Sequence, residues 1–418
     1  MNPDPKRIWI ITPYYPPDGG PSAPIYSAIA EALADYGYQV EIITAFPHYK
    51  SSVSPKYRGK WFVSEKHESI SIYRGFVCAG NVSNIWKRIL NYLSMDLSAS
   101  ILAFRHAKPD LVLTHTPILI IGLAALLLRR FRGVPFLYYI EDLYPDVVVQ
   151  AGAIKQGWVS RLLAMQERWA YSSSSHIVTM IEAQKEVLVR LGIPGGKISI
   201  IPCIVDIDLI SPIGKKTTVR ENLKLSDQII VSYIGVFGYA QGVETILLAA
   251  KILQGRSDLH FLIVGAGPKK DALLQLKAMH QLENVTFLEY QHRDKMPELL
   301  AISDISLVPL KRNVGTYAIP SKTYSIMASG RPLIATVEEE SDLGKLILQT
   351  GAGLVVPPEN ANVLADAIVQ LADSPEMREK MGKAGRSYVA TYLNRAKVMS
   401  QWGELVEETI SNTTKDER

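Results

Sequence analysis

The sequence has few cysteines and no long apolar run. Cys78 and Cys203 are the only cysteines in 418 residues, and their wide separation suggests neither a disulfide framework nor a metal site. We therefore expect free thiols in a reducing compartment. The longest apolar run, residues 117–128, has 12 residues, which is short of the roughly 20 that cross a bilayer. Residues 1–7 are polar and do not resemble a secretory signal, so we expect a cytoplasmic protein.

Excess charge of either sign is also lacking. The chain has 45 basic and 41 acidic residues, a net charge of +4, which is too balanced to indicate a nucleic-acid binder. With 47% hydrophobic and 21% charged residues, the composition is that of a globular protein and excludes a disordered chain. The length suggests two or three domains.

Strand and helix patterns alternate along the chain and restart once. Short apolar runs typical of buried strands alternate with segments of helical spacing, and we expect strands at 8–12, 39–44, 70–77, 110–114, 135–140, 176–180 and 198–202. Residues 205–227 lack periodicity, so we place the domain boundary there. The alternation then resumes, with strands expected at 229–235, 259–265, 285–289, 305–310, 332–336 and 353–357. This order predicts two doubly wound α/β domains with parallel sheets.

Sheets of this kind bind ligands at the carboxyl ends of their strands, and the first candidate is the loop after the first strand. Gly19 and Gly20 follow Asp18 there and precede a helix. Glycine lets a backbone approach a ligand closely, and a helix N-terminus offers N–H groups to an anion. An ordinary tight loop is the alternative interpretation.

The second candidate follows a buried strand in the second half of the chain. Lys311 and Arg312 come first, and Pro320 and Ser321 then mark the start of a helix, Ser321 being a residue typical of an N-cap. Lys322 lies in the first turn, where its charge opposes the helix dipole. A phosphate at the helix N-terminus would make that charge favourable. A solvated surface lysine is the alternative.

Two further strand ends carry polar side chains. His115 follows one buried strand, and Glu141 and Asp142 follow the next. A histidine at this place can contact a ligand or be a satisfied polar residue. The two carboxylates could orient hydroxyl groups or act as a base. Adjacent side chains of an extended backbone point to opposite sides, so we expect one of the two to face the site.

Two weaker motifs favour turns over sites. Asp206 and Asp208 form a D-x-D pattern in the segment between the halves, where a turn with Asx-type hydrogen bonds is the favoured interpretation. Gly265 and Gly267 belong to a fragment of a dinucleotide fingerprint that lacks its third glycine. No metal site is therefore expected.

Together these segments resemble glycosyltransferase family 4. The resemblance covers nearly the whole chain and rests on YYPPDGGPSA, LVLTHTP, EDLYPD, YIGVFGYAQGVETILLAAKIL, FLIVGAGP and IPSKTYSIMASGRPLIA. It implies the GT-B fold, with two facing Rossmann-like domains. We expect an acceptor-side domain at 1–208, to which 395–418 return, and a nucleotide-sugar domain at 209–394. Within the family the chain is most similar to transferases of amino-deoxy sugars or fucose in O-antigen, capsule and colanic acid synthesis.

The resemblance also implies roles for the candidate residues. Gly19 and Gly20 match the loop near the donor phosphates and sugar. His115 matches a histidine that contacts the donor sugar near the reacting centre, and we place Asp142 beside it as a catalytic candidate. Residues 320–322 match the loop and helix start that hold the diphosphate.

The chain departs from the family pattern at four positions. The family has an arginine and a lysine, five residues apart, where this sequence has Val236 and Gln241. It has two glutamates, eight apart, where this sequence has Tyr317 and Ser325. Other cations must then meet the charge of the diphosphate. The expected substrate-binding residues are Gly19, Gly20, Lys311, Arg312, Thr316, Tyr317, Ser321, Lys322 and Ser325, and the expected catalytic residues are His115 and Asp142.

The resemblance predicts sugar transfer from a nucleotide diphosphate sugar, which we expect to be UDP-linked, to a glycan or lipid-linked acceptor in bacterial surface polysaccharide synthesis. Lys322, with Lys311 or Arg312, would stabilise the departing diphosphate. The family implies a hexosyltransferase-type enzyme that retains the anomeric configuration and needs no obligatory metal or other cofactor. A catalytically inactive module that binds a glycan or a partner stays open, as does a sugar-nucleotide epimerase of the same fold.

A lipid-linked acceptor also predicts a place in the cell. Residues 86–105 and 118–132 combine apolar residues with Arg and Lys, a composition that suits a membrane surface. Helices that face the core of the first domain are the alternative. We expect a cytoplasmic protein held peripherally at the inner face of the plasma membrane, with no nucleic-acid partner.

Overall fold

The chain divides into two compact units. Unit 1 comprises Met1–Pro202 and Val398–Arg418, and unit 2 comprises Cys203–Lys397. The last helix, α16 (Arg395–Asp416), begins in unit 2 and ends in unit 1. The computed structural model describes residues 5–19, 22–49, 53–79, 85–117, 122–145, 149, 156–214, 218–223, 225, 228–292, 295–312 and 319–416.

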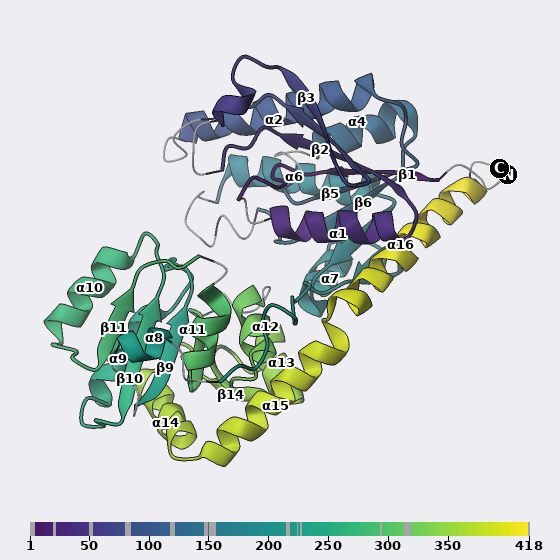
Figure 1. The fold of residues 1–418 in the computed structure, drawn as a ribbon. Helices are drawn as coiled ribbons and strands as arrows, with labels where there is room; N and C mark the ends of the chain where they lie inside the picture. Colours follow the sequence, from purple (N-terminus) through teal and green to yellow (C-terminus); the bar gives the residue numbers. More distant parts are fainter. Residues whose placement is uncertain are drawn as a thin grey trace. The chain divides into compact units, whose positions relative to one another are not determined.

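Unit 1 contains an eight-stranded sheet in the order β3-β4-β2-β1-β5-β6-β7-β8 (Figure 1). The pairing is parallel throughout, except that β3 runs antiparallel to β4. The central strands are buried along nearly their whole length, as expected for a parallel sheet covered by helices on both faces. The strands are β1 (Arg7–Ile11), β2 (Gln39–Ala45), β3 (Phe62–His67), β4 (Ile70–Gly75), β5 (Leu111–His115), β6 (Phe136–Ile140), β7 (His176–Thr179) and β8 (Ile198–Ile200).

The helices of unit 1 cover the sheet according to the direction in which the chain moves. From β4 the chain crosses the sheet in one direction, through α2 to β5, α4 to β6 and α6 to β7. Because such crossovers are right-handed, these three helices cover one face, whereas α1, which connects β1 to β2 in the other direction, covers the opposite face. Figure 1 shows α2 and α4 on the side away from α1. The helical segments are α1 (Ala23–Asp35), a 3₁₀ turn (Pro55–Tyr57), α2 (Ile85–Arg105), α4 (Leu123–Arg132), α6 (Trp158–Ser173), α7 (Glu182–Arg190) and a 3₁₀ turn (Gly195–Lys197).

Unit 2 contains a six-stranded, fully parallel sheet in the order β11-β10-β9-β12-β13-β14. This is the order of a Rossmann fold, in which the chain first moves outward from the first strand and then returns to its other side. The reversal places a topological switch point between β9 and β12. The strands are β9 (Ile229–Ile234), β10 (Leu259–Val264), β11 (Val285–Leu288), β12 (Ile305–Pro309), β13 (Leu333–Thr336) and β14 (Gly353–Val356).

Helices pack on both faces of this second sheet and bury its aliphatic side chains. One apolar cluster joins strands to α9 and α14, and another joins them to α12, α13 and α15. The helices are α8 (Thr218–Asn222), α9 (Val243–Ile252), α10 (Lys270–Met279), α11 (Met296–Ile302), α12 (Ser321–Ala328), α13 (Asp342–Thr350), α14 (Ala361–Ala372) and α15 (Pro375–Tyr392). None of the helices in the described part of the chain is both long and apolar enough to cross a membrane.

The predicted fold class, two Rossmann-like parallel-sheet units, is confirmed, and the sequence patterns failed at three elements. Strand β3 was not expected, because four of its six side chains are polar and none is fully buried at the sheet edge. Helix α15 was not expected either, because charged residues and two glycines interrupt its apolar spacing. The linker contains the short helix α8, where no periodicity is visible. The turn expected at Asp206 is confirmed, since its Oδ1 accepts the Leu209 N–H at 2.9 Å.

One glycine of α15 yields a test of the packing in unit 2. A Cβ at Gly382 would lie 2.1 Å from the carbonyl oxygen of Gly330, which is rigid backbone at the end of α12. Helix propensity alone favours Gly382→Ala by about 1 kcal/mol, but the clash should reverse the sign and destabilise the protein by roughly 1–3 kcal/mol. Urea unfolding measures the difference. Gly255→Ala, whose Cβ meets no described atom within 4 Å, is the control that should leave stability nearly unchanged.

Candidate functional site

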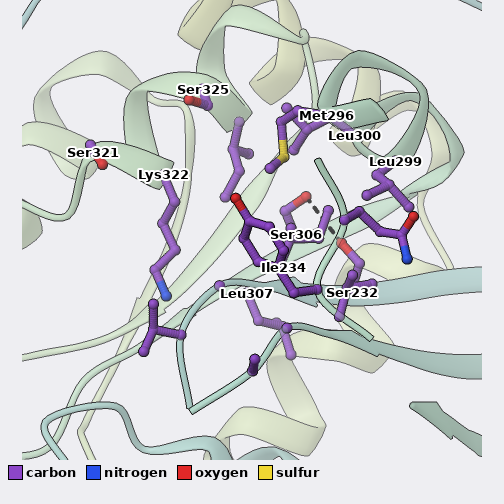
Figure 2. A pocket seen from close by; sticks show the side chains of 18 residues that line it. Ser232, Ile234, Met296, Leu299, Leu300, Ser306, Leu307, Ser321, Lys322 and Ser325 are labelled. Atoms are coloured by element: carbon purple, nitrogen blue, oxygen red, sulfur yellow. Dashed lines mark hydrogen bonds between the residues drawn. The ribbon is translucent and has the colours of Figure 1, made fainter. Parts of the chain in front are cut away.

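A cavity of about 240 Å³ lies at the switch point of unit 2. It is bounded by β9 and β12, by the carboxyl end of β10, by the segments after β9 and β11, and by α11 and α12. Open α/β sheets bind ligands at such switch points. Figure 2 shows Met296, Leu299 and Leu300 of α11 on one side and Lys322 of α12 on another. The lining residues are Ser232, Ile234, Gly235, Val236, Val264, Gly265, Ala266, Tyr290, Gln291, Met296, Leu299, Leu300, Ser306, Leu307, Ser321, Lys322, Ser325 and Ile326.

The side chain of Lys322 is the one cation in the described lining of this cavity. Its Nζ donates a hydrogen bond to Gln241 Oε1 at 2.9 Å and lies 4.2 Å from the centre of the Tyr233 ring. The Tyr233 hydroxyl in turn donates to the Val236 carbonyl at 2.7 Å, so ring and loop are fixed together. The interpretation of Lys322 as a solvated surface lysine is therefore wrong. The sequence patterns did not indicate Tyr233, because its contact with Lys322 joins β9 to α12, which lie far apart in the chain.

Burial lowers the pKa of Lys322 from its ordinary value to about 7. Among the described residues the ammonium has the neutral Gln241 amide and an aromatic face as partners, and it forms no ion pair with a carboxylate there. An amide and a ring stabilise a cation less than water does, so the neutral amine gains relative to the ammonium. A lysine in this state is suited to bind an anion, because the negative charge would raise the pKa of the amine and keep it protonated.

The start of α12 differs from the prediction in one respect. Pro320, not Ser321, occupies the N-cap position, and it provides no side-chain cap, so Ser321 is the first residue of the helix. The N–H groups of the first turn thus lack a capping side chain at the edge of the cavity. Ser321 and Ser325 both line the cavity with Lys322, and Figure 2 shows all three on one helix.

Lys311 and Arg312 follow the carboxyl end of β12, at the same edge of the sheet as the cavity. The Lys311 N–H donates to the Ala240 carbonyl at 3.1 Å, next to Gln241, but neither Lys311 nor Arg312 lines the cavity. The Lys311 ammonium adds to the burial that lowers the pKa of Lys269. The candidates Thr316 and Tyr317 lie outside the described residues.

Glycines allow the loops around the cavity to cross closely. A Cβ at Gly265 would lie 1.9 Å from the Gly235 carbonyl oxygen, and one at Gly267 would lie 2.6 Å from that of Phe237. The protein backbone itself requires these glycines. The expected turn follows directly, with the Gly267 carbonyl accepting the Lys270 N–H at 3.1 Å.

In unit 1, His115 ends β5 and is held on both ring nitrogens. Its Nδ1 lies 2.9 Å from the Thr116 carbonyl oxygen, which can only accept, so we assign the hydrogen to Nδ1. Its Nε2 lies 3.3 Å from the Thr12 hydroxyl, which follows β1. The ring stacks on Tyr26 with a centroid distance of 4.6 Å and is 5% exposed. The unit 1 sheet has its own switch point between β1 and β5, and Thr12 and His115 join its two sides.

The adjacent carboxylates after β6 have different surroundings, as expected. Glu141 turns inward: its Oε1 accepts the Tyr26 hydroxyl at 3.0 Å, and its Oε2 lies 3.9 Å from His115 Nδ1. Asp142 is exposed to solvent. Neighbouring protein atoms still displace enough water to raise the pKa of its carboxyl group, and the Glu141 charge raises it further. Glu141, which the list of expected site residues omitted, is thus the carboxylate that contacts the histidine cluster.

The loop after β1 is fixed by Asp18 and leaves Gly19 open. The Asp18 carboxylate is buried and accepts the backbone N–H groups of His48 and Tyr49 at 2.8 and 3.1 Å, which ties this loop to the one after β2. A Cβ at Gly19 would meet no described atom within 4 Å, so the described fold does not itself require a glycine there. Gly20 lies outside the described residues.

Arg74 of β4 forms hydrogen bonds with the same loop, and the sequence patterns did not indicate this role. Its guanidinium is buried, donates to Glu65 Oε2 of β3 at 2.7 Å, and donates to the carbonyl groups of Tyr15 and Pro16. A single arginine in a strand gives no sequence signal for this role, because its partners lie far apart in the chain.

Lys322→Met should change how stability depends on pH. The pKa of Lys322 is about 7 in the folded protein and about 10.4 in an unfolded chain. Between these values the unfolded chain binds more protons, so the stability of the native protein rises with pH. The variant should lack this rise. Its free energy of unfolding should therefore fall relative to that of the native protein as the pH increases from about 6 to about 10. Urea midpoints across this range measure the effect, and Lys383→Met, at an exposed lysine of α15, should keep the native profile.

Comparisons with known proteins cover almost the whole chain. Residues 20–203 match the family described as glycosyl transferase 4-like domain, and residues 215–388 match glycosyl transferases group 1. The chain is 27% identical over 383 residues to WcaI of Escherichia coli, a glycosyl transferase assigned to colanic acid biosynthesis, covering 90% of this chain and 93% of that relative.

Solved structures share the fold. Sucrose-phosphate synthase from Thermosynechococcus elongatus superposes with a TM-score of 0.77 at 22% identity, over 97% of this chain and 100% of that one. HepE of Anabaena, solved with UDP and glucose, gives a TM-score of 0.70 at 13% identity, over 96% and 100%. With a 4-like domain in its first half, a group 1 domain in its second and the GT-B fold throughout, the chain belongs to glycosyltransferase family 4.

Proposed function

We propose that this protein is an active transferase that moves a sugar from a UDP-sugar to a glycan or lipid-linked acceptor in bacterial surface polysaccharide synthesis. The observation that carries the proposal is the Lys322 ammonium, which lies in a cavity at the switch point of unit 2 without a carboxylate partner among the described residues. The relative that is assigned to colanic acid biosynthesis supports the polysaccharide pathway, and the solved structure of the same fold that contains UDP supports the nucleotide.

The diphosphate of the donor is proposed to lie between Lys322 and the start of α12. The uncapped N–H groups of the first turn and the ammonium both favour negative charge there. Charge develops on the diphosphate as the bond to the sugar breaks, and a cation held in a site of low polarity stabilises that charge strongly. Lys311 and Arg312 are proposed to add a weaker, longer-range field, since neither lines the cavity.

The loops of unit 1 are proposed to hold the sugar and the acceptor. Gly19 offers a backbone without a side chain, and Asp142 offers an exposed carboxyl group whose raised pKa suits proton exchange with a hydroxyl. His115 is proposed to act through the position of its Nε2, fixed by Thr12. Retention at the anomeric carbon is part of the proposal and rests on the family.

Lys322→Met should weaken binding of UDP to the full-length protein by roughly 10- to 100-fold, since a hydrogen bond to a charged group contributes about 1.5–3 kcal/mol. Titration calorimetry at neutral pH measures the affinity. Lys383→Met serves as the matched control, because that lysine is exposed on α15 and pairs with Glu379. An affinity of Lys322→Met equal to that of the native protein would contradict the phosphate role.

Transfer itself is tested with UDP-sugars and lipid-linked bacterial acceptors. The native protein should release UDP only when an acceptor is present, and the sugar should appear on the acceptor. Donor binding without product would favour an inactive binding module. A new sugar nucleotide formed without acceptor would favour an epimerase, and either result would overturn the proposal.

We also propose that transfer requires no resident metal or other cofactor. The cation that faces the diphosphate in this proposal is the Lys322 side chain, which leaves a divalent ion without a necessary electrostatic role. Activity of the native protein should be unchanged after incubation with EDTA and buffer exchange. A loss that Mg²⁺ or Mn²⁺ restores would contradict this part of the proposal.

A further inference from the structure

Helix α2 of unit 1 has apolar residues on both of its faces: Met95, Ala99, Leu102 and Ala103 are buried, and leucines lie on the outer side. Leu90, Leu93 and Leu97 lie on one face of the helix and are each more than half exposed. Ser94 and Ser98 face the interior and are nearly inaccessible. A helix that merely covers a sheet has polar residues on its outer face, so the exposed leucines of α2 are unexplained by the core of unit 1.

Helix α6 also has apolar residues on its outer side, in a segment for which the sequence patterns indicated no surface role. Trp158, Leu162, Met165 and Trp169 follow one another at spacings of four and three residues and are all exposed, Trp158 by 78%. Such large exposed apolar side chains are costly in water and mark an interaction surface when they gather.

Helix α4 lies between the other two and completes the surface. It contacts α2 on one side and α6 on the other, and all three cover the same face of the sheet. Leu123 and Phe131 of α4 are exposed, Phe131 by 68%. We call this surface the three-helix face. It consists of Leu90, Leu93, Leu97, Phe104, Leu123, Phe131, Trp158, Leu162, Met165 and Trp169.

The charges around the three-helix face have one sign. The only acidic residues in the three helices are Asp96 and Glu167, and each is 3% exposed. Asp96 accepts the Leu123 N–H, and Glu167 accepts the Tyr138 hydroxyl. The exposed charged side chains described on these helices are all basic: Lys87, Arg105, Arg129, Arg130, Arg161 and Arg168. An ordinary soluble surface mixes both signs.

We propose that the three-helix face binds the surface of a bilayer that contains anionic lipids. Leucine and tryptophan side chains would enter the boundary between head groups and acyl chains, and the arginines and lysine would contact the anionic head groups. A second copy of the chain fits poorly, because a symmetric contact would bring the basic residues of both copies together. The inference rests on the proposed function in one respect: membrane binding would bring the enzyme to a lipid-linked acceptor.

The test is co-sedimentation of the full-length protein with vesicles. We expect binding to vesicles of phosphatidylcholine with phosphatidylglycerol and much weaker binding to phosphatidylcholine alone. The double variant Trp158→Gln, Trp169→Gln should lose about tenfold or more in partitioning, because partitioning scales with the apolar area that is buried. The pair Arg161→Gln, Arg168→Gln should reduce binding chiefly at low salt, where charge attraction is least screened.

The matched control is Ile252→Gln with Leu348→Gln, two exposed apolar residues on α9 and α13 of unit 2. This pair should bind vesicles like the native protein. Native protein that ignores anionic vesicles, or tryptophan variants that bind as well as the native protein, would overturn the proposal. So would a dimer in sedimentation velocity that the same tryptophan variants abolish. Calorimetry with UDP is run on every variant: unchanged affinity verifies the fold, and failure of the native protein to bind UDP would refute the proposed function but not the vesicle result.

Discussion

The strand order of each sheet reverses beside its first strand, and the placement of every functional feature depends on that reversal. Right-handed crossovers carry the helices to one face before the reversal and to the other face after it. In unit 2 the loops on the two sides of the switch point part and leave the cavity that Lys322 lines. In unit 1 the same reversal joins Thr12 to His115 and collects α2, α4 and α6 on one side, separate from α1. One topological constraint thus yields both a ligand edge and a continuous outer surface.

The cation in unit 2 comes from a different element than the family pattern suggests. Where the family has its arginine and lysine, the loop after β9 has Val236 and Gln241, and Lys322 reaches the same loop from α12. A positive charge beside this loop can therefore come from residues of more than one element of the chain. Gln241 takes a new role in this arrangement, since its amide oxygen accepts from the ammonium. The structure offers a physical reason why the departures from the family pattern need not remove the site.

The sequence predicted those features that depend on local pattern. The buried strands, most of the helices and the fold class follow from apolar periodicity, and Lys322 followed from its place in the first turn of a helix. The features that it did not predict depend on distant partners. Edge strand β3 and helix α15 have weak periodicity of their own, and Arg74, Tyr233 and Glu141 gain their roles from contacts with residues far along the chain. The composition of residues 86–105 suggested a surface role, but which residues of α2 point outward could not be predicted, because amphipathic spacing does not show which face of a helix meets the sheet.

The buried guanidinium of Arg74 connects an edge strand to a ligand loop. Its partners are Glu65 on β3 and the carbonyl groups that precede Asp18 and Gly19. Strand β3 is the antiparallel edge of the sheet, next to β4, which belongs to the parallel ladder through its pairing with β2. Strand β3 then acts as a brace: a chain that lost this edge strand in evolution would keep its parallel strands, but Arg74 would lose its carboxylate partner and the loop after β1 part of the support that gives it a defined shape.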